Sequence, residues 1–95
     1  MQENKQQNYL LLKKGILSED TKGRPVLVNP EGNAYAINHL LQLVWNEMDG
    51  RKAQEQIVEN ILMKQHGHSN LPYQKQEIFK IIEKLKSVDL ASELL

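Results

Sequence analysis

The side chains able to do chemistry are few, and their spacing builds no catalytic or metal centre. The imidazoles are His39, His66 and His68, and the chain has no cysteine. His66 and His68 could offer two nitrogen ligands, but no acidic or thiol ligand is forced nearby, and such a pair in a loop of Gly, Ser and Asn is more often solvated. His39 stands at an expected helix start and is interpreted as structural. We therefore expect no metal ion and no cofactor.

The nucleophiles and carboxylates form no catalytic pattern either. No serine lies in a nucleophile-elbow sequence, and no glycine-rich phosphate loop follows an expected strand. Glu77 and Glu83 lie six positions apart, which does not bring two carboxylates together on one helix face. The sequence therefore predicts that the chain is not an enzyme acting alone.

The composition indicates one small domain that works in a reducing compartment. The chain has 95 residues, and residues 1–8 (MQENKQQN) offer nothing to bury, so we expect a disordered tail at 1–8 and a single domain at 9–95. Twelve basic and twelve acidic residues cancel, which weakens any attraction to nucleic acid or to an anionic membrane. The absence of cysteine favours the cytoplasm. No apolar run approaches the ~20 residues that span a bilayer.

Three short strands are expected in the first forty residues. Residues 9–12 and 16–17 are apolar with Gly15 between them, which is compatible with one bulged first strand or with a short helix-like lead-in, and we favour the strand. The second and third strands, at 26–29 and 34–38, carry alternating apolar side chains. The segment NPEGN between them has the proline and glycine that a tight turn uses. The simplest arrangement is an antiparallel meander.

Three amphipathic helices are expected after the strands. Asn38 is a suitable N-cap for the first helix, and Asp49-Gly50 ends it. The second helix ends in the loop at 66–70, and the third begins near Leu71-Pro72. The fold class is therefore α+β, with a three-stranded antiparallel sheet followed by a three-helix, winged-helix-like bundle. The apolar positions expected inside are Leu40, Leu41, Val44, Trp45 and Met48, then Ala53, Ile57, Ile61 and Leu62, and finally Ile78, Ile81, Ile82, Leu85 and Val88.

A winged-helix outline also admits a different class of protein, a DNA-binding regulator. Its last helix would enter a major groove, and this helix carries several lysines. Glu77 and Glu83 interrupt the row of lysines, and no arginine is present on the helix to bind guanine with two hydrogen bonds. A helix face of mixed charge is more often plain solvated surface.

The expected third strand has room beside it. Tyr35 and Ile37 share one face of this strand, whereas Ala34 and Ala36 share the other. Small side chains on an edge strand leave space for something else to pack there. The candidates are the N-terminal tail, a second copy of the chain or a separate partner.

An ordered set of motifs resembles the PqqD-like family, whose members are also called RiPP recognition elements. The resemblance covers roughly residues 16–91. This chain departs from the family pattern at Ala53, where a capping Thr or Ser is usual, at Asp89, where Gly is common, and in the longer loop HGHSN. The matching segments are Val26 to Gly32, Ala36 to Asn38, Val44-Trp45, Asp49-Gly50, Ile57, Leu62, Glu77-Ile78, Ile81-Ile82, Leu85 and Leu90.

The resemblance implies a leader-peptide recognition module. In the family, the peptide adds a strand to the edge of the third strand and presses apolar side chains against the last helix. The implied partners are a ribosomally made precursor peptide and a modifying enzyme, such as a radical SAM protein of PQQ or other RiPP biosynthesis. No nucleic acid or membrane is expected, and a homodimer is left open. The implied peptide-binding residues are Ala34, Tyr35, Ala36, Ile37 and Asn38 on the strand and Ile78, Phe79, Ile82 and Glu83 on the helix.

Phe79 is the expected peptide anchor on the last helix. It points about 100° away from Ile78 around the helix axis, so the core stripe does not need it. The alternative is a satellite contact with Tyr9 or Leu11.

Overall fold

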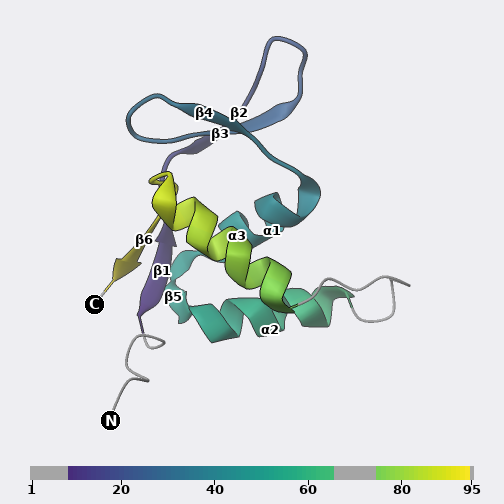
Figure 1. Ribbon diagram of the computed structural model, residues 1–95, viewed down its shortest axis with the longest axis vertical. Coiled ribbons are helices and arrows are strands. Elements are labelled where there is room, and N and C mark those ends of the chain that lie inside the picture. The colour runs from purple at the N-terminus through teal and green to yellow at the C-terminus, as the bar shows by residue number, and fades with distance from the viewer. Residues whose placement is uncertain (1–8, 66–74, 95) are drawn as a thin grey trace.

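The computed structural model describes residues 9–65 and 75–94, which form an α+β fold with two three-stranded antiparallel sheets and three helices (Figure 1). The α+β class is therefore confirmed. The predicted tail at 1–8, the loop at 66–70 with His66 and His68, and the helix start near Leu71-Pro72 lie outside the described residues. The elements are β1 (Leu10–Lys13), β2 (Ile16–Glu19), β3 (Pro25–Val28), β4 (Ala34–Ala36), α1 (His39–Glu47), β5 (Asp49–Ala53), α2 (Gln54–Gln65), α3 (Lys75–Ser87) and β6 (Ala91–Leu94).

The prediction of one bulged first strand is wrong, because the chain there forms two strands in different sheets. β1 pairs with β5 and β6, whereas β2 pairs with β3. Gly15 joins them with φ at 85°, in the left-handed region that favours glycine. A Cβ at this position would clash with the carbonyl oxygen of Val28. Gly15 thus marks a change of sheet rather than a bulge.

The sheet ordered β5-β1-β6 was not predicted. The sequence predicts a helix stop at Asp49-Gly50 followed by the second helix, but residues 49–53 form β5, whose Ala53 pairs with Leu10. β6 follows α3 and pairs with β1 in a continuous register from Leu10 to Lys13. Leu11 is the buried residue of β1, and it joins this sheet to the core.

The sheet ordered β2-β3-β4 contains the predicted hairpin. The turn between β3 and β4 is closed by Asn29, whose Oδ1 accepts hydrogen bonds from the N–H groups of Glu31 and Asn33, both at 3.0 Å. The Gly32 N–H donates to the Asn29 carbonyl at 2.9 Å, and Gly32 has the expected positive φ. β4 ends at Ala36, two residues earlier than predicted, because the chain then turns into α1.

Side chains at the helix starts satisfy N–H groups that have no partner within the helix. Asn38 caps α1 as predicted, and its Oδ1 accepts from the Leu41 N–H at 2.8 Å. At the start of α2, the Gln56 side chain accepts from the Ala53 N–H at 3.1 Å. This is one half of a capping box, and it compensates for the absence of a Thr or Ser at Ala53.

α3 ends in a turn that places Asp89 in the left-handed region, with φ at 62°. The Leu90 N–H donates to the Leu85 carbonyl at 2.8 Å, and the Asp89 N–H donates to the Lys86 carbonyl at 3.3 Å, which is the Schellman pattern. Asp89 also forms an ion pair with Lys14. Aspartate tolerates this conformation better than most residues that carry a side chain, so the turn forms here without a glycine.

The core lies where α1, α2 and α3 pack together against β1 and β3. In Figure 1, α3 crosses in front of α1, α2 runs along the lower side, and the β2-β3-β4 sheet lies at the opposite end. The indole N–H of Trp45 donates to the carbonyl oxygens of Lys14 and Leu90, both at 3.2 Å. Lys14 directly follows β1 and Leu90 directly precedes β6, so this N–H holds the two segments together. The buried apolar residues of this core are Leu11, Leu27, Leu40, Val44, Trp45, Met48, Ile57, Val58, Ile61, Ile78, Ile82, Leu85, Leu90 and Ala91.

Candidate functional site

A groove runs between β4 and the C-terminal half of α3. It has a free volume of about 160 Å³, enough for one or two apolar side chains. Its walls come from β4 and the residue after it, from the first turn of α1, and from α3 and the chain that follows. The lining residues are Tyr35, Ala36, Ile37, Leu41, Lys84, Leu85, Val88 and Leu90.

The outer edge of β4 has no partner strand in the part of the chain that the structure describes. Hydrogen-bonded and non-hydrogen-bonded residue pairs alternate along an antiparallel ladder. At the turn, the Asn29 N–H donates to the Asn33 carbonyl oxygen, so Leu27 and Tyr35 form the next hydrogen-bonded pair. Ala34 and Ala36 belong to the non-hydrogen-bonded pairs on either side of the Leu27–Tyr35 pair. Their backbone N–H and C=O groups therefore point away from β3, toward the open edge.

Asn29 fixes the β3–β4 hairpin against the end of α3. Its Nδ2 donates to the Val88 carbonyl oxygen at 2.9 Å, while its Oδ1 holds the turn. The Asn29 side chain is buried, so these bonds are shielded from water. One residue thus sets both the turn and the separation of the two walls of the groove.

Most of the predicted strand residues lie at this groove. Tyr35, Ala36 and Ile37 line it, and Tyr35 and Ile37 are half-buried against the core. Ala34 is exposed at the edge beside it. Asn38 does not line it, because its side chain is used to cap α1.

The predicted helix residues are not brought to the groove. Ile78 and Ile82 are completely buried in the core, so their side chains are closed to a peptide. Glu83 is exposed and forms an ion pair with Lys86 at 3.1 Å. The groove instead uses Lys84 and Leu85, which lie further along α3, and Val88, which directly follows the helix.

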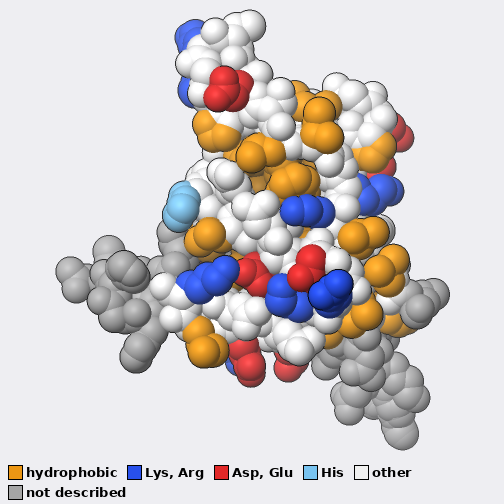
Figure 2. Space-filling model, turned by 180° about the vertical axis from the view of Figure 1, so that it is seen from behind, with side chains coloured by type: hydrophobic (Ala, Val, Ile, Leu, Met, Phe, Trp, Pro, Cys, Tyr) orange, Lys and Arg blue, Asp and Glu red, His pale blue; other side chains and the backbone are white. Residues whose placement is uncertain are grey.

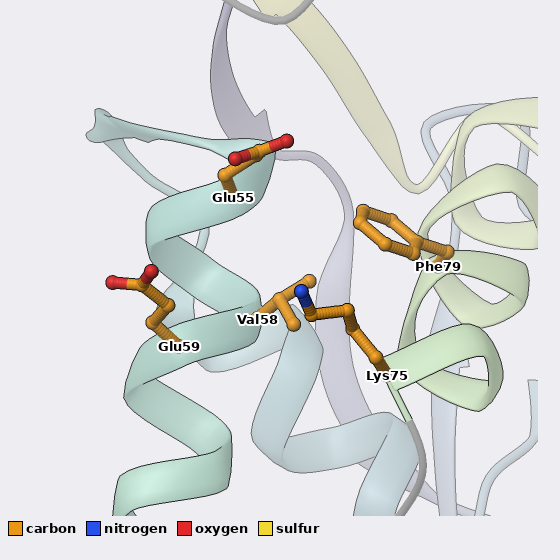
Figure 3. A pocket seen from close by; sticks show the side chains of 5 residues that line it. All are labelled: Glu55, Val58, Glu59, Lys75 and Phe79. Carbon is orange, nitrogen blue, oxygen red and sulfur yellow. The ribbon is translucent and has the colours of Figure 1, made fainter.

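Phe79 faces a different part of the molecule. It lines a hollow between α2 and α3, where both the Phe79 ring and the Lys75 side chain point toward α2 (Figure 3). The other lining residues, Glu55, Val58 and Glu59, come from α2. The free volume of about 20 Å³ is enough for roughly one water molecule and not for a peptide side chain. The hollow shares no lining residue with the groove beside β4.

Sequence reasoning missed Leu41, Lys84 and Val88. The signal that could have found Lys84 and Val88 is their spacing, since residues four apart lie on the same face of a helical turn, and the Val88 N–H donates to the Lys84 carbonyl oxygen. Leu41 follows the N-cap Asn38 by three residues and is half-buried at the groove. Its place became visible only once the angle between β4 and α1 was known.

A buried carboxylate lies outside the groove, at the end of α1. Glu47 accepts from Lys64 at 2.6 Å and from Asn60 at 3.2 Å, and Lys52 lies 3.2 Å from its Oε1. Burial alone would raise the pKa of Glu47, but these hydrogen bonds outweigh it and hold the pKa below its usual value. Since every bond joins α1 to β5 or α2, this cluster holds the elements together.

Within 9–65 and 75–94, no group of three or more His, Asp or Glu side chains could hold a metal ion, and none of the helices is long and apolar enough to cross a membrane. His39 is exposed at the first position of α1.

The face away from α3 has hydrophobic side chains gathered over the β2-β3-β4 sheet and, below them, charged side chains of both signs side by side (Figure 2).

Comparison with known proteins gave no significant match to a family model, to a curated protein or to a solved structure.

Proposed function

We propose that this chain is a recognition module that binds an extended peptide as an added strand on the outer edge of β4. The observation that carries the proposal is an unpaired strand edge directly beside an apolar groove. The outward N–H and C=O groups of Ala34 and Ala36 would bind the backbone of the peptide. Its alternate side chains would enter the groove toward α3.

The apolar lining must supply most of the affinity. Ala34 and Ala36 together offer two N–H and two C=O groups, and such hydrogen bonds contribute about 0.5–1.5 kcal/mol each. Ordering a flexible peptide costs about 2–5 kcal/mol, so these two contributions nearly cancel. A Kd near ~1 μM needs about 8 kcal/mol. The groove holds one or two apolar anchors at about 1.5–3 kcal/mol each, so we expect weaker binding than this, with a Kd of about 10 μM to 1 mM.

The resemblance to PqqD-like domains gives this binding a biological setting. In that setting the bound segment is the leader part of a ribosomally made precursor peptide. The chain would present it to a modifying enzyme, such as a radical SAM protein of PQQ or another RiPP pathway, and would itself carry out no reaction. Two observations support this setting: Ala36 and Ile37 of the motif Ala36 to Asn38 line the groove, and Asn29 of the motif Val26 to Gly32 donates a hydrogen bond to the carbonyl oxygen of the lining residue Val88.

The DNA-binding alternative gains no support from the arrangement of α3. Its Lys86 is engaged by Glu83 at 3.1 Å and by Glu93 at 2.8 Å, so one of the basic groups that would approach phosphate is already neutralised. Leu85, on the same helix, is completely buried. A gel shift at ~150 mM salt with tight, site-selective binding would restore this alternative.

A selection of random linear dodecapeptides displayed on phage, with the full chain as bait, tests the proposal. The Kd of an enriched synthetic peptide is then measured for the wild type, Ala36→Pro and Ala36→Ser. Proline removes an N–H that points outward and leaves the β3–β4 ladder intact. We expect Ala36→Pro to weaken binding about tenfold or more while Ala36→Ser binds like the wild type. No enriched peptide, or equal binding by both variants, would contradict the proposal.

A further inference from the structure

The groove contains two polar side chains among its lining residues, and both can donate hydrogen bonds. Tyr35 brings a phenol from β4, and Lys84 brings an ammonium group from α3. Within residues 9–65 and 75–94, neither group has a hydrogen-bond or ion-pair partner. All the other lining side chains are apolar.

The carboxylates near this end of α3 are already engaged by other cations. Glu83 precedes Lys84 in the chain, but its carboxylate lies 3.1 Å from Lys86 Nζ. Glu93 also binds Lys86, and Asp89 binds Lys14. Since no carboxylate is among the lining residues, the groove carries one positive charge that the described residues do not compensate.

We infer that the groove selects a peptide with an aspartate or glutamate beside its apolar anchor, and that Lys84 and Tyr35 bind this carboxylate. The inference rests on the proposed function, because it concerns the same groove. A peptide that covers the groove removes water from Lys84, and an uncharged peptide would leave this ammonium group without a partner. A carboxylate replaces the lost water, whereas a lysine in the peptide would place two like charges together.

The strand geometry adds a spacing rule to this preference. Successive side chains of a strand point to opposite faces, so only every second residue of the bound peptide enters the groove. The acidic residue and its nearest apolar anchor must therefore lie two positions apart. The expected pattern is an aspartate or glutamate, any residue, and then a large apolar residue, or the reverse order.

The test uses one peptide from the selection on the full chain and variants of that peptide. Each groove-facing position is made Asp, Asn, Lys or Leu in turn, and the Kd of each peptide is measured at ~50 and ~300 mM salt. The protein variants are Lys84→Gln, Lys84→Glu and Tyr35→Phe. Lys80→Gln is the matched control, because Lys80 is exposed one turn earlier on α3 and does not line the groove.

We expect one position at which Asp binds about tenfold more tightly than Asn, with the difference shrinking at high salt. Lys84→Gln should remove this difference, Lys84→Glu should reverse it in favour of the Lys peptide, and Lys80→Gln should leave it unchanged. Tyr35→Phe should reduce it in part. Peptides that bind with no acidic preference, or a preference that survives Lys84→Gln, would overturn this inference and leave the proposed function standing. A library without any binder would overturn both.

Discussion

Tyr35 lies opposite Leu27 in the β3–β4 ladder, and this pairing decides which backbone groups of β4 face outward. Leu27 is completely buried, and Tyr35 packs beside the same core. A slip of the register by one residue would turn Tyr35 away from the core and would give Ala34 and Ala36 inward hydrogen bonds. The proposed peptide site therefore depends on the turn that sets the register.

Replacing Asn29 with aspartate should uncouple the hairpin from α3. Aspartate keeps an oxygen that can accept from the turn N–H groups, but it cannot donate to the Val88 carbonyl oxygen. We expect the free energy of unfolding to fall by about 1–3 kcal/mol. Urea unfolding followed by the fluorescence of Trp45, the single tryptophan, measures this change. Asn46→Asp, at an exposed position of α1, is the matched control and should change stability by less than about 0.5 kcal/mol.

Replacing Gly15 with alanine should be among the most damaging single changes. Both Gly15 and Gly23 have positive φ, so alanine at either site costs about 1–2 kcal/mol of backbone strain. Only Gly15 has the Val28 carbonyl oxygen close to the position of the new Cβ, whereas Gly23 has open space there. Gly15→Ala should therefore lose at least about 1 kcal/mol more than Gly23→Ala in the same urea experiment. Equal losses of stability would mean that the backbone near Gly15 and Val28 shifts to make room for the new Cβ at no cost, which would contradict this prediction.

Replacing Glu47 with glutamine should make stability less dependent on acid pH. The pKa of Glu47 is lowered in the folded chain from its ordinary value of 4.5, so its contribution is complete above about pH 4.5 and is lost as the pH falls through the lowered pKa. At pH 7 we expect Glu47→Gln to cost about 1–3 kcal/mol, because Lys52 and Lys64 lose their shared partner.

The pH profile gives this prediction its control. The difference in unfolding free energy between wild type and Glu47→Gln should stay constant from pH 7 to about pH 5 and then shrink. Glu59→Gln, on the exposed side of α2, should differ little from the wild type at any pH. A difference for Glu47→Gln that grows below pH 4 would show that the sign of the effect is wrong.

Val88→Ala and Phe79→Ala should separate the groove from the hollow between α2 and α3. Both side chains are half-buried and pack against the core, so both variants should lose about 1–2 kcal/mol of stability. Only Val88 lines the groove beside β4, so only Val88→Ala should also weaken binding of a selected peptide, by about 1 kcal/mol or more. Fluorescence anisotropy at a temperature where both variants are folded measures the Kd. A larger binding defect in Phe79→Ala than in Val88→Ala would show that the peptide contacts Phe79 rather than the groove beside β4.

The local elements could be predicted from the sequence because short-range chemistry decides them. Asn38 caps α1, the turn at Asn29 to Asn33 closes the hairpin, and Asp49-Gly50 follows the end of α1, each through contacts within a few residues. The core positions on α3 follow from helical spacing, and Ile78, Ile82 and Leu85 are indeed completely buried.

The long-range pairings could not be predicted in the same way. β5 and β6 pair with β1 from about forty and eighty residues away, and the sequence DGRKA of β5 has none of the alternating apolar side chains that mark a strand. The error at Phe79 has a similar origin. Helical spacing shows that Phe79 leaves the core stripe, but only the packing of α2 shows which neighbour it then faces.

Amide hydrogen exchange along β4, with and without a peptide from the phage selection, tests the central claim most directly. The N–H groups of Ala34 and Ala36 point to the open edge, whereas that of Tyr35 already lies inside the β3–β4 ladder. Strand addition should therefore slow exchange at Ala34 and Ala36 by about tenfold or more and leave Tyr35 nearly unchanged. Exchange that stays fast at Ala34 and Ala36, or protection that falls mainly on α2, would contradict the account.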